Sequence, residues 1–255
     1  MIIKLLLDTG KVDPDTKDKN GFTPLLYAVR KGHKGVVKQL LDTGIVDLDT
    51  KDKIGLTPLL HAIRNRDDVI AKQLLETGKV DPNTRDKQGW TPLLWAVCGG
   101  REGVVKQLLD TGKVEADSRD RQGWTPLLWA AYKGYEGVVT QLLNTGNVNA
   151  DTRDRHGWTP LLWAVCGGSE GVVKQLLDTG KVDADSRDRE GWTPLLWAAH
   201  KGYEGIVKQL LDTGKVDPNT RDKQGWTPLL WAAHNGHESV VRLIQDTRKV
   251  KRNTT

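Results

Sequence analysis

The side chains that most often carry out catalysis are few and scattered in this 255-residue chain. The six histidines are His33, His61, His156, His200, His234 and His237. Only His234 and His237 are close in sequence, and Gly236 breaks the helical pattern between them. A metal site needs further ligands at suitable spacing, and no phosphate loop, nucleophile elbow or pair of catalytic carboxylates is present. We therefore expect no enzymatic activity, no metal site and no cofactor.

Tryptophan is the residue type whose spacing indicates binding. Five tryptophans recur 34 residues apart: Trp90, Trp124, Trp158, Trp192 and Trp226. A second set follows the first at a constant offset: Trp95, Trp129, Trp163, Trp197 and Trp231. Because tryptophan is enriched among the residues that dominate protein interfaces, we expect an aromatic strip that binds a partner. The alternative is that the rings fasten neighbouring segments together and cover backbone.

The tryptophan spacing belongs to a repeat that runs through the chain. A glycine recurs every 34 residues, at Gly21, Gly55, Gly89, Gly123, Gly157, Gly191 and Gly225. Self-similarity at a fixed period of this length is typical of a solenoid of stacked units. We count that glycine as position 1, so the tryptophans occupy positions 2 and 7.

Each unit reads as helix, turn, helix and long loop. In the unit that starts at Gly191, Thr193 can cap a first helix and Pro194 suits its first turn. Gly202 and Gly214 end the two helices. The expected buried residues are Leu195, Ala198, Ala199, Ile206, Val207, Leu210 and Leu211.

Three motifs of the unit closely resemble those of the ankyrin repeat: G-x-T-P-L-x-x-A-A, G-x-E and V-V-x-x-L-L-x-x-G. The resemblance implies an all-α ankyrin-repeat solenoid with long loops or β-hairpin-like turns, acting in protein–protein interaction. The unit departs from the family in a loop one residue longer and in Leu196, where the family usually has histidine. The wording LLDTGKVDxDTRDxxGWTPLLWAA resembles ankyrin arrays of filamentous fungi. Those arrays often follow NLR-like nonself-recognition domains, which implies the ligand-sensing region of a larger immune-type receptor.

We expect one ankyrin-repeat domain over residues 1–255. Its parts are a partial repeat 1–20, full repeats 21–54, 55–88, 89–122, 123–156, 157–190 and 191–224, a capping repeat 225–250 and a tail 251–255. Residues 1–10 resemble a second helix without its first helix, so we expect this end to expose apolar side chains and to be the contact if the chain self-associates. Arg66 replaces the glycine that ends the first helix, which should weaken the N-terminal end.

Differences between the units concentrate at four positions. Position 10 holds Arg30, Arg64, Cys98, Tyr132, Cys166, His200 and His234. The other three are positions 11, 13 and 34. Position 13 includes Arg101, Tyr135 and Tyr203, and position 34 includes Gln122, His156 and Glu190. Position 7 shares a helix face with positions 10 and 11. We expect these positions to give specificity to a tryptophan-lined concave groove; neutral drift is the alternative.

The loops carry a second periodic pattern of cation, aspartate and cation, from Lys17-Asp18-Lys19 to Arg221-Asp222-Lys223. Three interpretations are open: a solvated series that supports turns, a surface for an anionic protein, and a nucleic-acid site with bases stacked on tryptophan. The net charge of +5 over 38 basic and 33 acidic residues is too mixed to indicate nucleic acid. The first interpretation is favoured, because each central aspartate offsets its neighbours and falls where ankyrin repeats use one to hold the turn.

Cys98 and Cys166 occupy position 10 two repeats apart. With packed helices ~8–10 Å apart, they are too distant for a disulfide, which needs Cα atoms about 4.4–6.8 Å apart. We expect free thiols and a reducing, cytoplasmic location. No apolar run is long enough to cross a membrane. A structural spacer or self-assembling rod without a ligand remains the alternative to a binding module.

Overall fold

A computed structural model of the chain describes residues 12–253. The expected helix in residues 1–10 lies outside the described residues. Over residues 12–253 the secondary structure is entirely α-helical, with no strand, and long loops join the helix pairs. The predicted all-α fold class is therefore confirmed.

The helices come in pairs along the chain. The first helix of each pair is one of α2 (Pro24–Arg30), α4 (Pro58–Arg64), α6 (Pro92–Cys98), α8 (Pro126–Lys133), α10 (Pro160–Cys166), α12 (Pro194–Lys201) and α14 (Pro228–His234). The second helix is one of α3 (Lys34–Asp42), α5 (Asp68–Glu76), α7 (Glu102–Asp110), α9 (Glu136–Asn144), α11 (Glu170–Asp178), α13 (Glu204–Asp212) and α15 (Glu238–Asn253). Each pair falls inside one 34-residue unit.

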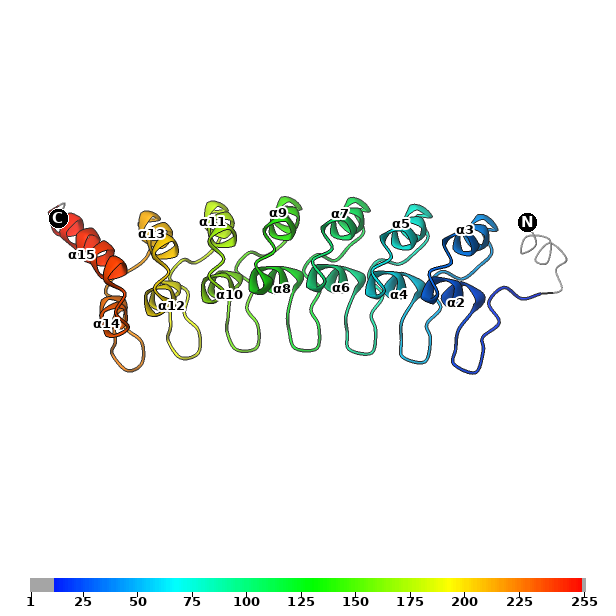
Figure 1. The fold of residues 1–255 in the computed structure, drawn as a ribbon, viewed down its shortest axis with the longest axis horizontal. Coiled ribbons are helices and arrows are strands. Elements are labelled where there is room, and N and C mark those ends of the chain that lie inside the picture. The colour runs from blue at the N-terminus through cyan, green and yellow to red at the C-terminus, as the bar shows by residue number, and fades with distance from the viewer. Residues whose placement is uncertain (1–11, 254–255) are drawn as a thin grey trace. The chain divides into compact units, whose positions relative to one another are not determined.

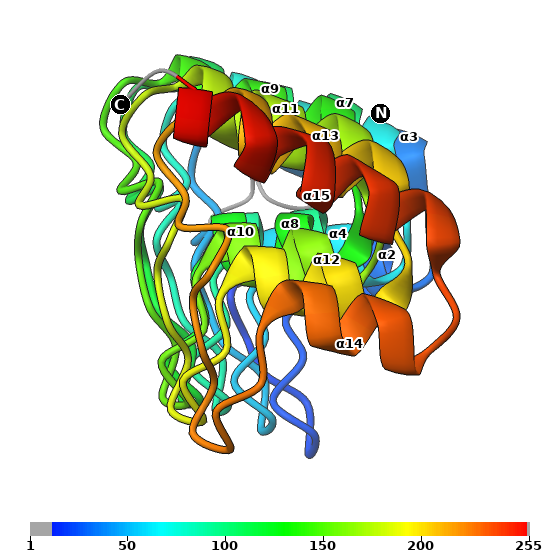
Figure 2. The ribbon, with the colours of Figure 1, turned by 90° about the vertical axis from the view of Figure 1, so that its left-hand side faces the viewer.

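The chain divides into two compact units, residues 1–121 and 122–255. In the first unit α2, α4 and α6 pack side by side, and so do α3, α5 and α7 (Figure 1). In the second unit α8, α10, α12 and α14 form one layer, and α9, α11, α13 and α15 form the other (Figure 2). Within each unit the long loops extend away from the layer of first helices (Figure 1).

Local sequence explains where the helices begin and end. The Thr193 hydroxyl accepts from the backbone N–H of Leu196 at 3.3 Å, which satisfies one free donor at the start of α12. Gly202 ends α12 with φ 73°, a left-handed conformation that glycine adopts without steric cost. Arg66 takes the same conformation, with φ 59°, and is the one non-glycine residue with positive φ in the described part of the chain.

The core lies between the two helix layers and between neighbouring repeats. Leu195, Leu196, Ala198 and Ala199 of α12 are fully buried, with 0% exposure. Ile206, Val207 and Leu210 of α13 are equally buried, and Leu211 is 8% exposed, as the periodicity predicts. Leu196, which replaces the usual histidine, therefore contributes to an apolar core.

The final repeat departs from the others at both helices. Gly214 ends α13 with φ 68°, whereas Arg248 stands at that position in the last repeat and α15 continues to Asn253. The helix thus extends past residue 250, where we expected the repeat to end. In the expected capping repeat 225–250, Arg242 and Gln245 of α15 are exposed, and Leu230 of α14 is 49% exposed.

Candidate binding surface

The central aspartate of each loop holds the turn that leads into the next first helix. Asp154 is 7% exposed, and its Oδ1 accepts from the backbone N–H groups of His156 at 2.8 Å and Trp158 at 2.9 Å. Gly157 donates its backbone N–H to the Asp154 carbonyl at 3.1 Å. The turn-supporting role predicted for this aspartate is therefore confirmed.

The same aspartate fastens the tryptophan at position 7. The indole N–H of Trp163 donates to Asp154 Oδ2 at 3.1 Å, and Trp197 donates to Asp188 Oδ2 at 3.2 Å. Trp95 and Trp231 make the equivalent bonds to Asp86 and Asp222, at 3.0 and 2.8 Å. These tryptophans therefore have a structural role, which was the alternative to a purely binding one.

His61 takes the place of this tryptophan in the repeat that starts at Gly55. Its Nε2 lies 2.8 Å from Asp52 Oδ2, and the residue is 5% exposed. Burial lowers the pKa of His61, although its hydrogen bond to the Asp52 carboxylate acts in the opposite direction. A buried histidine with a single carboxylate partner is a packing residue. In the sequence, only the position of His61 in the repeat indicates this role.

The tryptophans of the second unit form one interleaved series of rings, which we call the tryptophan ladder. Its members are Trp124, Trp129, Trp158, Trp163, Trp192, Trp197, Trp226 and Trp231. Within a repeat the position 2 and position 7 rings lie 4.4–4.6 Å apart. Position 2 of one repeat also contacts position 7 of the next, at 4.9–5.3 Å. In the first unit Trp90 and Trp95 make the same pair at 5.0 Å. The two columns of tryptophans therefore alternate, which brings their rings within contact distance.

The tryptophan side chains are only partly accessible to solvent. All ten are half-buried. The physical reason is that each ring packs against other rings. Four position-7 indoles also donate a hydrogen bond to a loop aspartate: Trp95, Trp163, Trp197 and Trp231. What faces solvent is the outer side of a preorganised aromatic surface.

Position 10 adds a further ring to this surface. Tyr132 packs edge-on against Trp124, Trp129 and Trp163 at 5.6, 6.3 and 5.2 Å, and it remains 44% exposed. His200 packs in the same way against Trp192, Trp197 and Trp231, at 5.4, 6.3 and 5.1 Å. Burial lowers the pKa of His200, and the cationic Lys201 lowers it further. His234 is exposed and contacts Trp226 and Trp231 edge-on at 5.2 and 6.3 Å.

Position 13 contacts the preceding repeat, which sequence reasoning missed. The Tyr203 ring packs directly over Gly168, so closely that a Cβ there would displace it. His237 packs over Gly202 and lies 3.1 Å from the carbonyl oxygen of His200.

Arg101 at the same position is also engaged within the chain. It forms an ion pair with Asp68, and its Nη2 donates to the carbonyl of Arg66 at 3.3 Å. Arg101 is thus a structural contact, and Tyr135 and Tyr203 are half-buried.

The first cation of several loop triplets bridges two repeats, as Lys51, Arg85, Arg153 and Arg187 do. Arg153 Nη1 donates to the carbonyls of Gly157 and Arg187, both at 3.0 Å. Arg187 Nη1 does the same to Gly191 and Arg221, at 3.2 and 2.9 Å. These first cations support turns, as favoured, but they do so through hydrogen bonds to backbone carbonyls rather than as solvated charges.

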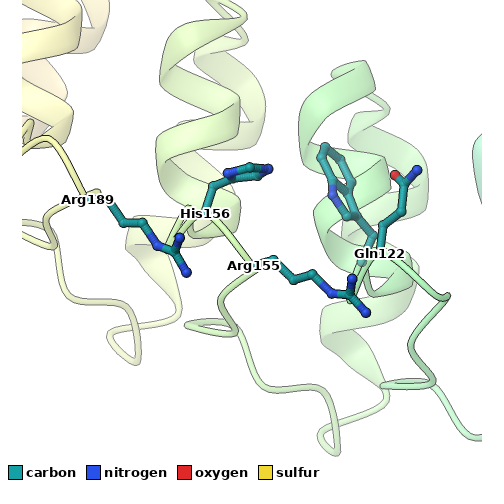
Figure 3. Close-up of a pocket in the computed structure, with 5 residues that line it drawn as sticks. Gln122, Arg155, His156 and Arg189 are labelled. Atoms are coloured by element: carbon teal, nitrogen blue, oxygen red, sulfur yellow. The ribbon is translucent and has the colours of Figure 1, made fainter.

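The third cation of the triplet lines the mouth of a pocket in the second unit. Arg155, Arg189, His156, Gln122 and Trp124 border an open cavity of about 740 Å³, with His156 between the two arginines (Figure 3). The arginine stems rest on Gly123 and Gly157. Neither Arg155 nor Arg189 forms an ion pair with a described residue, whereas Lys223 lies 3.8 Å from Glu190. The pocket therefore presents two uncompensated guanidinium groups beside an indole.

The described residues form neither a metal site nor a membrane-spanning helix. Over residues 12–253 no group of three His, Cys, Asp or Glu side chains is close enough to hold a metal ion. No helix in the same range has the length and apolar character needed to span a bilayer. Neither Cys98 nor Cys166 forms a disulfide, as predicted, and burial raises the pKa of Cys166.

Comparisons with known proteins agree with the repeat geometry. A family model of three ankyrin repeats matches residues 1–86, 45–117, 68–152, 102–185 and 168–254. No curated protein matches the chain. Among solved structures, the ankyrin repeat domain of Bcl-3, described as a unique member of the IkappaB protein family, matches with a TM-score of 0.76 and 26% identity. That match covers 89% of this chain and 100% of the other. Because the family model covers nearly the whole sequence, the chain belongs to the ankyrin-repeat family, whose members are in general non-enzymatic protein–protein interaction modules.

Proposed function

We propose that the chain recognises a protein partner through the tryptophan ladder and the position-10 side chains beside it. The observation that carries the proposal is the pattern of change along this surface. The tryptophans are invariant through the second unit, while position 10 alternates between Tyr132, Cys166, His200 and His234. The constant tryptophans provide a shared aromatic surface. The residue at position 10 differs between repeats and can therefore give each part of that surface its own specificity.

The physical chemistry of the ladder supports binding. Interlocked rings lose little conformational freedom when a partner docks, so less of the interaction energy is spent on ordering side chains. Half-buried tryptophans supply the large apolar contacts that dominate interfaces. The hydrogen bonds from the indoles to the loop aspartates also fit the alternative of a structural spacer, because a spacer needs its repeats held together. Variation at position 10, which those bonds do not involve, favours recognition.

The loop pocket indicates the chemistry of one part of the partner. Arg155 and Arg189 offer planar donors that suit a carboxylate and lack an acidic partner among the described residues. From Asp52 onward the aspartates between the loop cations are buried, and Asp154, for example, accepts hydrogen bonds from backbone and indole N–H groups. We therefore favour an acidic segment of a protein over nucleic acid at this pocket.

The wider biological role follows only from resemblance. The similarity to regular ankyrin arrays of filamentous fungi supports a ligand-sensing region of an NLR-like immune receptor in a reducing, cytoplasmic compartment. The free thiols are consistent with that compartment.

A displayed random-peptide library tests the proposal. Peptides selected on the wild-type chain should bind a Tyr132→Ala/His200→Ala variant at least about tenfold more weakly, since large aromatic contacts are lost. The matched control is Lys174→Ala/Lys208→Ala, which shortens two exposed side chains on α11 and α13. Equal binding by both double variants, or no selectable peptide, would contradict recognition by this surface.

The pocket has its own variant, Arg155→Gln/Arg189→Gln, compared with Lys174→Gln/Lys208→Gln, which removes the same charge elsewhere. Acidic peptides should lose affinity only with the pocket variant. A single-stranded oligonucleotide that binds more tightly than the acidic peptides would instead support the nucleic-acid alternative.

A further inference from the structure

Three consecutive repeats of the second unit offer the same three-tryptophan arrangement but different residues at position 10. Tyr132 and His200 each fill their arrangement with a fourth ring. In the repeat between them the equivalent tryptophans are Trp158, Trp163 and Trp197, and position 10 is Cys166. Cysteine has no ring, so this arrangement has three rings where its neighbours have four.

The three rings hold their positions without the fourth. Trp158 lies 4.4 Å from Trp163 and 5.3 Å from Trp197. The filled arrangements have 4.6 and 4.9 Å around Trp124, and 4.6 and 5.0 Å around Trp192. The hydrogen bonds of Trp163 and Trp197 to Asp154 and Asp188 keep their indoles in place. The incomplete arrangement is therefore preformed, and its Trp158–Trp197 separation is slightly larger.

The neighbouring residues also leave this place uncovered. Beside Tyr132 and His200 position 11 is a lysine, and Lys133 Nζ lies 5.2 Å from the centre of the Tyr132 ring. Beside Cys166, position 11 is Gly167, which has no side chain to cover the indoles. Tyr203 is directed to Gly168 and contacts none of the three tryptophan rings.

We propose that Trp158, Trp163 and Trp197 form a binding site for one aromatic side chain of the protein partner, which occupies the place that Tyr132 and His200 fill in the adjacent repeats. The inference rests on the proposed recognition function and names the chemistry of its central contact. The edge of the incoming ring meets the electron-rich indole faces, as the edges of Tyr132 and His200 do. Position 10 thus decides in each repeat whether the chain or its partner supplies the fourth ring.

The tryptophan indole N–H signals of isotope-labelled protein report the site directly. The probe is p-cresol, the side-chain analogue of tyrosine, and the control ligand is n-butylammonium, the analogue of lysine. We expect p-cresol to shift the signals of Trp158, Trp163 and Trp197 saturably. Cys166→Tyr should weaken this binding at least about tenfold, because the chain's own ring then occupies the site.

Reciprocal variants make the test specific. Tyr132→Cys should create a second p-cresol site that shifts Trp124, Trp129 and Trp163. Cys166→His, patterned on His200, serves if Cys166→Tyr does not fold. Unchanged p-cresol binding in the filled variants, absence of saturable shifts, or stronger binding of n-butylammonium would each overturn the proposal.

The outcome can be separated from that of the broader function. If library peptides bind Cys166→Tyr as well as wild type but lose affinity with Tyr132→Ala/His200→Ala, this site is wrong and recognition by the surface stands. If p-cresol binds as expected and no peptide is selectable, the site exists and the protein-recognition function fails.

Discussion

Replacing Asp185 with asparagine should stabilise the protein, because the carboxylate occupies a place built for an amide. Asp185 lies in the loop after α11, where burial is the main cause that raises its pKa. Its Oδ1 is buried without a hydrogen-bond partner, and the same holds for Asp49 and Asp151 at this repeat position. A carboxylate has no proton to donate at neutral pH, so it cannot form a hydrogen bond with a backbone carbonyl group.

Asn83 at the same repeat position shows what an amide does there. Its Oδ1 accepts from the backbone N–H of Glu115 at 2.8 Å, and its Nδ2 donates to the carbonyl of Lys113 at 2.8 Å. Asp185 already accepts from the backbone N–H of Asp217. Asp185→Asn should keep that bond and add a donor to the carbonyl of Lys215, which corresponds to Lys113.

The expected gain is about 1 kcal/mol in the free energy of unfolding at neutral pH, the net contribution of one intramolecular hydrogen bond. For a chain of this size it corresponds to a rise of about 2–4 °C in the melting midpoint. The pH dependence has a definite sign. Because the folded-state pKa of Asp185 is raised, the carboxylate disfavours the fold above that pKa, and the penalty disappears below the unfolded value. The advantage of asparagine should therefore shrink in acid.

Urea and thermal unfolding at neutral and acid pH measure the effect, followed by helical circular dichroism. Asn83→Asp is the reciprocal control and should destabilise, since it removes the donor to Lys113. A variant Asp185→Asn that is no more stable than wild type at neutral pH would refute the reasoning. So would a harmless Asn83→Asp.

Three further outcomes are expected. Arg66→Gly should stabilise by about 1 kcal/mol, because glycine adopts the left-handed conformation freely; Gly100→Ala should act in the opposite direction in the same urea titration. Trp197→Phe should lower stability by about 1–3 kcal/mol while circular dichroism stays helical, since Asp188 keeps a buried oxygen without its indole donor; unchanged stability would mean that this bond is dispensable. Cys166 should react with iodoacetamide more slowly than free N-acetylcysteine at mildly alkaline pH, because burial raises its thiol pKa; equal rates, measured by mass spectrometry, would show an unperturbed thiol.

Local and periodic features of the fold could be predicted from the sequence. Helix boundaries follow from Thr193, Pro194 and Gly202, whose conformational preferences act within one turn and need no distant partner. The buried stripe of Leu195, Ala198 and Ala199 follows from helical spacing. Such features depend on distances along one unit, and the repeat then copies them.

Contacts between repeats were decided by the tertiary structure alone. The sequence shows that Asp188 and Trp197 recur together, but only the fold brings the carboxylate to the indole N–H and half-buries the ring. In the same way Arg101 is paired with Asp68 and Tyr203 covers Gly168, although variability alone suggested free surface residues. The physical reason is that Arg101 and Tyr203 contact residues of the preceding repeat, and the geometry of such contacts is set by how one unit stacks on the next. The sequence thus contains the residues that can form these contacts, and the stacking of the repeats decides which of those residues meet.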